Sequence, residues 1–110
     1  MTADIGAQLR RGVVEYCVLG LLARAPMYGW QLAAALTERG MIASIGTLYP
    51  LLARLRAREL VRTYAEASAS GPTRKYYRIT ESGSAELAAF RDQWRSYARA
   101  VGDIIEEEHA

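Results

Sequence analysis

Apolar residues recur every three or four positions along most of this 110-residue chain, which is the spacing of helices that bury one face. The first such pattern spans residues 7–24, and its apolar set is wide enough to be buried on more than one side. Pro26 ends this helix, because proline cannot continue a helix interior. A second helix is expected at residues 28–39, with Gly40 as its C-terminal stop and with four residues facing inward, namely Trp30, Leu32, Ala33 and Leu36.

A third helical pattern follows, in which four leucines form an apolar stripe: Leu48, Leu51, Leu52 and Leu55. Ser44 is a suitable N-cap. Pro50 is tolerable only close to the first turn, where few backbone amides have partners within the helix. We therefore expect the regular helix at about residues 47–58. Its outer face is basic, because arginines stand between and after the leucines, at Arg54, Arg56 and Arg58.

Two short β-type stretches, residues 60–64 and 75–80, come next. The segment between them, AEASASGPTR, is small and polar and contains Gly and Pro, so it predicts a mobile hairpin tip. In the second stretch, alternation places Tyr77 and Ile79 on the same face of the strand. We therefore expect Tyr77 in the core rather than in contact with DNA.

The last helix is expected to begin after Thr80 as N-cap, with Glu81 in its first turn, where a negative charge suits the helix dipole. Its apolar residues are spaced 3, 4, 3, 4 and 3 apart, an a/d register typical of a seam for a second helix. A monomer would expose this seam as a large apolar patch. We therefore expect a homodimer in which this helix pairs with the first helix of the partner subunit, through Leu87, Phe90, Trp94, Tyr97, Val101 and Ile104.

The net charge of +2 is distributed unevenly. Residues 54–78 carry seven basic against two acidic side chains, whereas residues 79–110 carry three basic against seven acidic ones. The positive middle of the chain predicts contact with a polyanion. No apolar run approaches the roughly 20 residues of a membrane span, no signal peptide is recognisable, and a single Cys17 allows no intramolecular disulfide. We therefore expect a cytoplasmic protein that does not contact a membrane.

Three helices, a hairpin and a long terminal helix are the order of elements in a winged helix-turn-helix domain with a dimerisation helix. The expected fold is thus mainly α with a small β-hairpin wing: residues 1–79 form the DNA-binding domain, and residues 80–110 form the dimerisation helix and an acidic tail. In this fold the third helix enters the major groove, which places Arg54 and Arg58 on phosphates, and Thr47 and Tyr49 near bases.

Two alternatives stand beside this interpretation. The basic face could be solvated and touch nothing, or the winged helix could bind a partner protein and never meet DNA. A protein-binding wing has no need of Arg74 and Lys75 beside a Gly-Pro tip, so these two charges favour nucleic acid.

Two motifs resemble the PadR family of bacterial transcriptional regulators: GTLYPLLARLRARELV at residues 46–61 and GPTRKYYRITESG at residues 71–83. MYGWQL at residues 27–32 is similar to the family's entry into its second helix, and Glu59 stands where the family usually has Gly. The resemblance covers roughly residues 12–90 and is to the small branch with one helix after the wing.

The resemblance implies a homodimeric repressor, with no cofactor. It would bind a palindromic double-stranded operator, often its own promoter, and release it when a small ligand binds. The residues expected to contact DNA are Ser44, Thr47, Tyr49, Pro50, Arg54, Arg58, Arg74 and Lys75.

Trp94 is unusual in the seam, because an a/d position usually takes Leu or Ile and a buried indole N–H needs a partner. Multidrug-sensing members of the PadR family are similar here, with a tryptophan on the same helix that stacks on planar cationic or aromatic ligands between subunits. The resemblance implies a pocket for a planar aromatic effector, lined by Trp94, Tyr97, Leu9, Val13 and Tyr16. The alternative is that Trp94 only fills the dimer core.

Nothing in the sequence points to catalysis or to a metal site. His109 is the only histidine, the acidic run Glu106–Glu108 is a solvated tail, and GPTRK lacks the spacing of a phosphate-binding loop. Cys17 lies among apolar residues with no evident cationic neighbour, so an inert core thiol is expected rather than a redox sensor. We therefore expect that the protein is not an enzyme.

Overall fold

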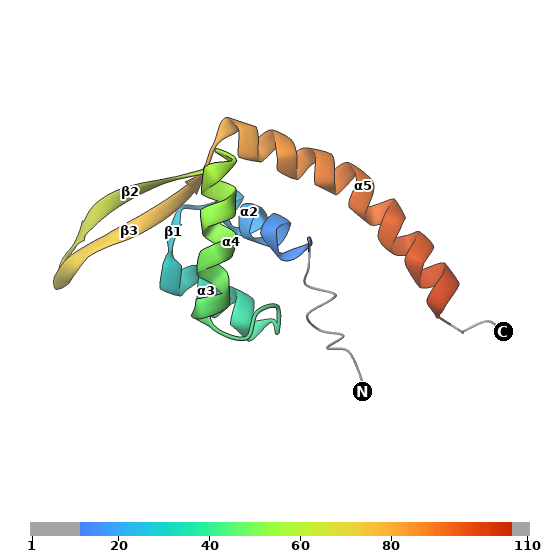
Figure 1. Cartoon of the computed structure of the whole chain (residues 1–110), viewed down its shortest axis with the longest axis horizontal. Coiled ribbons are helices and arrows are strands. Elements are labelled where there is room, and N and C mark those ends of the chain that lie inside the picture. Colours follow the sequence, from blue (N-terminus) through green and yellow to red (C-terminus); the bar gives the residue numbers. More distant parts are fainter. Residues whose placement is uncertain (1–11, 107–110) are drawn as a thin grey trace.

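The computed structural model describes residues 12–106 of the chain (Figure 1). Its elements are α2 (Val14–Arg24), β1 (Met27–Tyr28), α3 (Gly29–Glu38), α4 (Ile45–Ala57), β2 (Val61–Ser68), β3 (Gly71–Ile79) and α5 (Glu81–Ile105). The β2–β3 hairpin projects from one side of the three short helices, and α5 extends away on the other side (Figure 1). This mainly helical architecture with a small antiparallel sheet confirms the predicted fold class.

The sheet has three strands, with β3 in the centre between β1 and β2. Strand β1 was not predicted, because two residues are too few to show alternation; it pairs Met27 with Tyr77. The hairpin strands are longer than predicted, since β2 continues to Ser68 and β3 already begins at Gly71. The predicted ten-residue tip was therefore wrong. Backbone pairing across a hairpin does not require apolar side chains, so it continues through the small polar residues to a two-residue turn.

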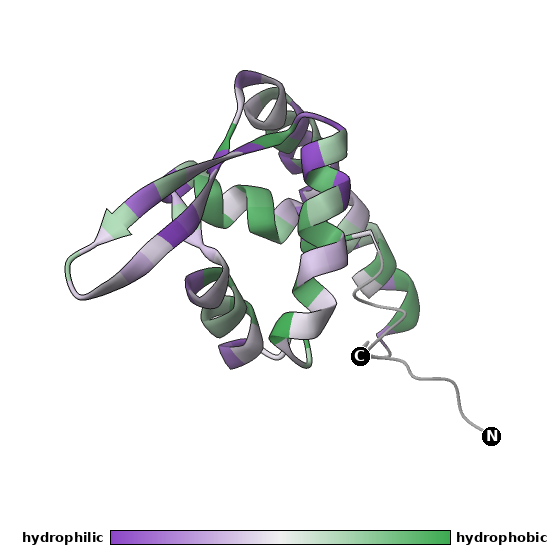
Figure 2. Cartoon of the chain, turned by 60° about the vertical axis from the view of Figure 1, so that its left-hand side comes forward, coloured by the Kyte–Doolittle hydropathy of each residue, from purple (hydrophilic) through white to green (hydrophobic). Residues whose placement is uncertain are grey.

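The core gathers leucines and valines from all three short helices, together with residues of the hairpin and the start of α5. The stripe of α4 is buried as predicted, and Leu32, Ala33 and Leu36 of α3 are buried with it. Trp30 was predicted to face inward, but it is 67% exposed. Positions two apart on a helix lie about 200° apart, so a residue two before Leu32 points to the opposite side. In Figure 2 hydrophobic residues line the inner sides of the helices, whereas the hairpin carries many hydrophilic ones.

Helix α4 begins two residues earlier than predicted, after Ser44 as N-cap. The Thr47 side chain completes this start, because its hydroxyl donates to the Ser44 carbonyl at 2.6 Å and accepts from the Ser44 N–H at 3.4 Å. Pro50 consequently lies in the second turn and not near the first. It removes only the N–H that would reach the Gly46 carbonyl, and since both residues are exposed, that carbonyl is open to water.

Helices α3 and α4 end in the same hydrogen-bonded motif. In α4 the N–H of Leu60 donates to Leu55 and the N–H of Glu59 donates to Arg56, both at 2.9 Å, which is a Schellman cap with Glu59 at φ 61°. Helix α3 closes in the same way around Gly40, at φ 72°. The left-handed position after α4 is thus occupied by a glutamate and not by a glycine.

The start of α5 is fastened to the end of α4. The Thr80 hydroxyl donates to the Glu59 carbonyl at 2.7 Å and accepts from the Gly83 N–H at 2.9 Å, which confirms Thr80 as the N-cap. Gly83 packs directly on the backbone of Leu60. A Cβ there would overlap the Leu60 carbonyl and come within 2.7 Å of Ile79 Cγ1, so only glycine allows this approach.

We predict that Glu59→Gly raises the free energy of unfolding by up to about 1 kcal/mol, as measured by urea denaturation. A non-glycine residue in the left-handed conformation costs about 1–2 kcal/mol, and the greater freedom of glycine in the unfolded chain offsets part of that gain. The matched control, Gly40→Ala in the equivalent cap, should lower stability by about 1 kcal/mol. Stabilisation by both changes would contradict this account.

Candidate nucleic-acid interface

Helix α4 presents two different flanks on either side of its outermost strip. At 100° per residue, Thr47, Arg54 and Arg58 lie on one flank, and Tyr49 and Arg56 lie on the other. All five side chains are exposed. Between the flanks the outermost strip carries only small or apolar residues, namely Gly46, Pro50, Ala53 and Ala57. The expected DNA-contacting residues are therefore divided between two sides of the helix.

The arginines of the first flank are paired with carboxylates on other helices. Arg54 Nε donates to Glu15 Oε2 of α2 at 3.0 Å, and Arg58 Nη2 donates to Glu86 Oε2 of α5 at 2.9 Å. The arginine side chains remain 61% and 50% exposed. The sequence did not reveal these partners, because no local pattern links residues so far apart in the chain.

Glu86 accepts from two groups with one oxygen. The Tyr16 hydroxyl donates to the same Oε2 at 3.0 Å. The hydrogen bond from Arg58, followed by the one from Tyr16, lowers the pKa of the Glu86 carboxyl below its usual value. Burial, followed by the hydrogen bond to Glu86, raises the pKa of the Tyr16 hydroxyl. The carboxylate thus stays ionised between a guanidinium on α4 and a phenol on α2.

The Tyr16 ring also begins an aromatic row along α5. It stacks on Phe90 with ring centroids 4.2 Å apart and planes at 7°, and Phe90 stacks on Trp94 at 5.5 Å. Trp94 is 42% exposed. Val13 is half-buried, and Leu9 lies outside the described residues. Two of the five residues expected around an effector, Tyr16 and Trp94, are thus linked through Phe90 within one chain.

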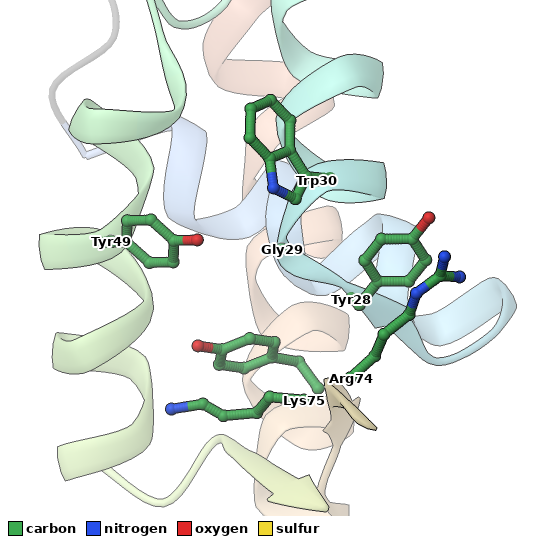
Figure 3. A pocket seen from close by; sticks show the side chains of 7 residues that line it. Tyr28, Gly29, Trp30, Tyr49, Arg74 and Lys75 are labelled. Carbon is green, nitrogen blue, oxygen red and sulfur yellow. The ribbon is translucent and has the colours of Figure 1, made fainter. Parts of the chain in front are cut away.

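On its other flank α4 faces a cavity of about 560 Å³ between the wing and the start of α3 (Figure 3). The structure brings three of the predicted residues together here: Tyr49 from α4, and Arg74 and Lys75 from β3. Sequence reasoning missed Tyr28 and misplaced Trp30, which complete the wall together with Gly29 and Tyr77. The Tyr77 side chain is only 5% exposed, as expected of a core residue.

The cavity is chemically suited to an anion. The Arg74 guanidinium lies 4.6 Å from the centre of the Tyr28 ring, and Figure 3 shows it beside that ring at the rim. Helix α3 begins at Gly29, so the positive end of its dipole faces the same space. A Cβ on Gly29 would lie 3.3 Å from the Tyr49 hydroxyl oxygen, so glycine lets the phenol approach the start of this helix. Two cations, a phenol and a helix N-terminus therefore line one concave surface, with Arg74 beside Tyr28 and Lys75 on the side of Tyr77.

The predicted dimer seam divides into two parts. Leu87 is 5% exposed and belongs to the core of its own chain, which leaves it little surface for a partner subunit, and Phe90 is half-buried. From Trp94 onward the seam is exposed, at Trp94, Tyr97, Val101, Ile104 and the adjacent Ile105. The first turns of α5 are held by the chain's own core. They directly follow Thr80, whose N–H donates to the Leu60 carbonyl at 3.0 Å, a contact that we call the Leu60 junction.

Cys17 is half-buried, and burial raises the pKa of its thiol. Within residues 12–106 no group of three His, Cys, Asp or Glu side chains is placed to hold a metal ion. In the same part of the chain, none of the helices has the length and apolarity needed to cross a membrane.

Residues 18–89 match the Transcriptional regulator PadR-like family. A transcriptional regulator of Mycobacterium tuberculosis is 33% identical over 94 residues, which cover 86% of this chain and 87% of that protein. A PadR-like regulator from Bacillus cereus has a similar solved structure, with 34% identity, a TM-score of 0.82 and coverage of 92% of this chain and 99% of that chain. The structure of PadR from Bacillus subtilis in complex with operator DNA is 26% identical, with a TM-score of 0.63 and coverage of 72% of this chain and 46% of that chain.

The family consists of transcriptional regulators and not of enzymes, in agreement with the expectation from the sequence. The match spans well over half of the chain and runs from the middle of α2 to the first turns of α5. The chain belongs to the PadR-like family of transcriptional regulators.

Proposed function

We propose that this chain is a cytoplasmic, homodimeric repressor that binds a palindromic operator through α4 and the wing, and that a planar aromatic effector releases it. The observation that carries the proposal is the cavity in which Tyr49, Arg74 and Lys75 meet the start of α3. Phosphate groups of a DNA backbone fit this set of cations, phenol and helix N-terminus. The PadR of Bacillus subtilis, whose fold is similar, was solved in complex with operator DNA, which supports DNA as the partner.

In this proposal α4 lies in the major groove with its small-residue strip toward the base edges. Because Gly46, Pro50 and Ala53 project little, the helix backbone can approach the bases closely. The two flanks of the helix then face the two phosphate-lined walls of the groove. Arg54 and Arg58 lie toward one wall, and Tyr49 with the two wing cations lies toward the other. Ser44 and Thr47, at the N-terminal end of α4, lie where such a helix usually reaches bases.

The exposed part of the seam supports a homodimer. Trp94, Tyr97, Val101 and Ile104 recur at a/d spacing on a helix whose far end has no other element of the described chain beside it (Figure 1). Pairing two copies would remove this apolar strip from water. The two recognition helices would then meet half-sites about one helical turn of DNA apart, or a multiple of that distance.

The aromatic row supports the effector site. A planar molecule between subunits could extend the stack Tyr16–Phe90–Trp94, with Tyr97 one turn beyond Trp94 on α5 and Val13 at the N-cap of α2. Binding there would favour one dimer geometry over another and so change the spacing of the recognition helices.

A winged-helix module that binds only protein is the alternative, and its binding would depend little on salt.

We predict that the double variant Arg74→Ala, Lys75→Ala binds the DNA upstream of its own reading frame about thirtyfold more weakly at 0.15 M salt. Because two phosphate contacts are lost, the plot of log K against log salt should become less steep, with the magnitude of its slope reduced by about 1.8. Fluorescence anisotropy of a labelled duplex at several salt concentrations measures both quantities. Arg99→Ala, an exposed arginine of α5 outside the proposed interface, should leave affinity and slope unchanged. An unaltered slope in the double variant would contradict the wing assignment.

We predict that Tyr97→Glu converts the dimer into a folded monomer at micromolar concentration. Tyr97 is 66% exposed within one chain, so the change should spare the fold, but a carboxylate in an apolar seam would be buried without a partner. Light scattering gives the mass, and circular dichroism confirms the helix content. Arg99→Glu, which also places a carboxylate on α5 but off the seam and changes the net charge even more, should remain dimeric. Equal masses for both variants would overturn this interface.

We predict that planar aromatic cations or phenolic compounds quench the fluorescence of Trp94 and not that of Trp30. The two tryptophans report on different sites, since Trp30 lines the cavity beside the wing and Trp94 stacks on Phe90 in the middle of α5. Titration of Trp30→Phe should retain the quenching, and titration of Trp94→Phe should lose it. If both variants respond alike, or neither responds, Trp94 belongs to the dimer core.

A further inference from the structure

Two carboxylates lie beside the proposed DNA-binding face, and one of them is positioned from two sides. Glu15 pairs with Arg54 alone among the described residues, whereas Glu86 accepts from both Arg58 and Tyr16 through Oε2. The Tyr16 ring is itself held by its stack on Phe90, 4.2 Å away. Glu86 therefore keeps a partner on α2 even when Arg58 leaves, so its carboxylate stays where the guanidinium can return to it.

A DNA phosphate and a carboxylate compete for the same donors. Both accept the paired N–H groups of a guanidinium in similar geometry, so Arg58 cannot satisfy both fully. The Arg58 and Glu86 side chains are 50% and 31% exposed. A solvent-exposed ion pair contributes little free energy, so Arg58 can exchange Glu86 for another anion. A phosphate held firmly at this point by a well-fitted duplex can displace Glu86, whereas one that passes transiently cannot.

We propose that Glu86 is a specificity-determining residue of the DNA-binding face. On duplexes that fit α4 poorly, Arg58 stays paired with the Glu86 carboxylate; on the operator, Arg58 leaves Glu86 and contacts a phosphate. Glu86 therefore lowers the affinity mainly for non-specific DNA. The proposal rests on the proposed function, because it requires α4 to bind DNA. It assigns to α5 a direct influence on the recognition helix, carried by a hydrogen-bonded group and not by packing alone.

The test compares two duplexes of equal length and composition. One carries the upstream sequence that the wild-type protein protects in footprinting, and the other is its scrambled version. Glu86→Gln removes the charge but retains an amide oxygen that accepts from Tyr16. We expect this variant to bind the scrambled duplex about fivefold more tightly at 0.15 M salt, with a slope steeper by about 0.9, which corresponds to one added phosphate contact. Its gain on the operator should be smaller, so the ratio of operator to scrambled affinity falls.

Three further variants make the result decisive. Glu81→Gln removes the same charge from the same helix at a residue with no ion pair in the described chain, and it should change neither slope nor ratio. In an Arg58→Ala background, Glu86→Gln should no longer steepen the slope. Tyr16→Phe keeps the stack on Phe90 but removes one of the two donors to Glu86 Oε2, so the carboxylate should hold Arg58 more strongly. Binding to the operator should weaken about twofold, whereas binding to the scrambled duplex, on which Arg58 stays paired, should change little.

Equal gains on both duplexes, a gain shared by Glu81→Gln, or a steeper slope that persists without Arg58 would each overturn the proposal. Thermal melting by circular dichroism checks that each variant is folded. Failure of the proposed function looks different, because the wild-type protein itself would then bind neither duplex, or bind both without dependence on salt.

Discussion

The structure depends on the leucine stripe of α4. Leu48, Leu52 and Leu55 are at most 1% exposed, and they lie in one cluster with residues of α2, α3 and the sheet. Burying each such side chain contributes about 1.5–3 kcal/mol, so the helix cannot rotate without losing most of what holds the domain together. This fixed orientation decides which residues face outward, and it places arginines on both flanks of a strip of small residues.

The features that the sequence predicted well are those set by local spacing. The leucine stripe, the N-cap at Thr80 and the glycine stop at Gly40 each depend on residues within one or two turns. Trp30 was misplaced because the helical pattern was taken as a block, without following the angle of each position. The longer hairpin strands were missed because side chains do not show where backbone pairing continues.

The site was predicted only in part, because its geometry arises from long-range contacts. Tyr49, Arg74 and Lys75 were each identified, yet nothing in their spacing indicated that they share a cavity with Tyr28 and Trp30. The partners of Arg54 and Arg58 lie 39 and 28 residues away in the chain, and they come together only because α2 packs against both α4 and α5. Neutralised arginines and free ones look alike in a sequence, so the basic face appeared more uniform than it is.

The two flanks of α4 therefore differ in electrostatic strength. On the wing side Arg74 and Lys75 form no ion pair within residues 12–106, although Glu66 lies opposite Arg74 on β2, so these two cations remain available to an approaching polyanion. On the α5 side each arginine is offset by a carboxylate, and an anion gains there only by displacing a partner. Early, non-specific attraction should thus be led by the wing, with the α5 flank engaged after α4 has settled.

Helix α5 connects these electrostatics to assembly. Its first turns belong physically to the winged domain, since Gly83 packs on Leu60 and Leu87 lies in the core, whereas its second half exposes the apolar seam. A rigid helix transmits a tilt from one end to the other, and the backbone of Leu60 directly follows the cap of α4. A partner or ligand that moves the exposed half must either bend α5 or shift Glu86 and the Leu60 junction. Both of these contacts involve the C-terminal end of α4, so binding along the seam should also change the position of α4.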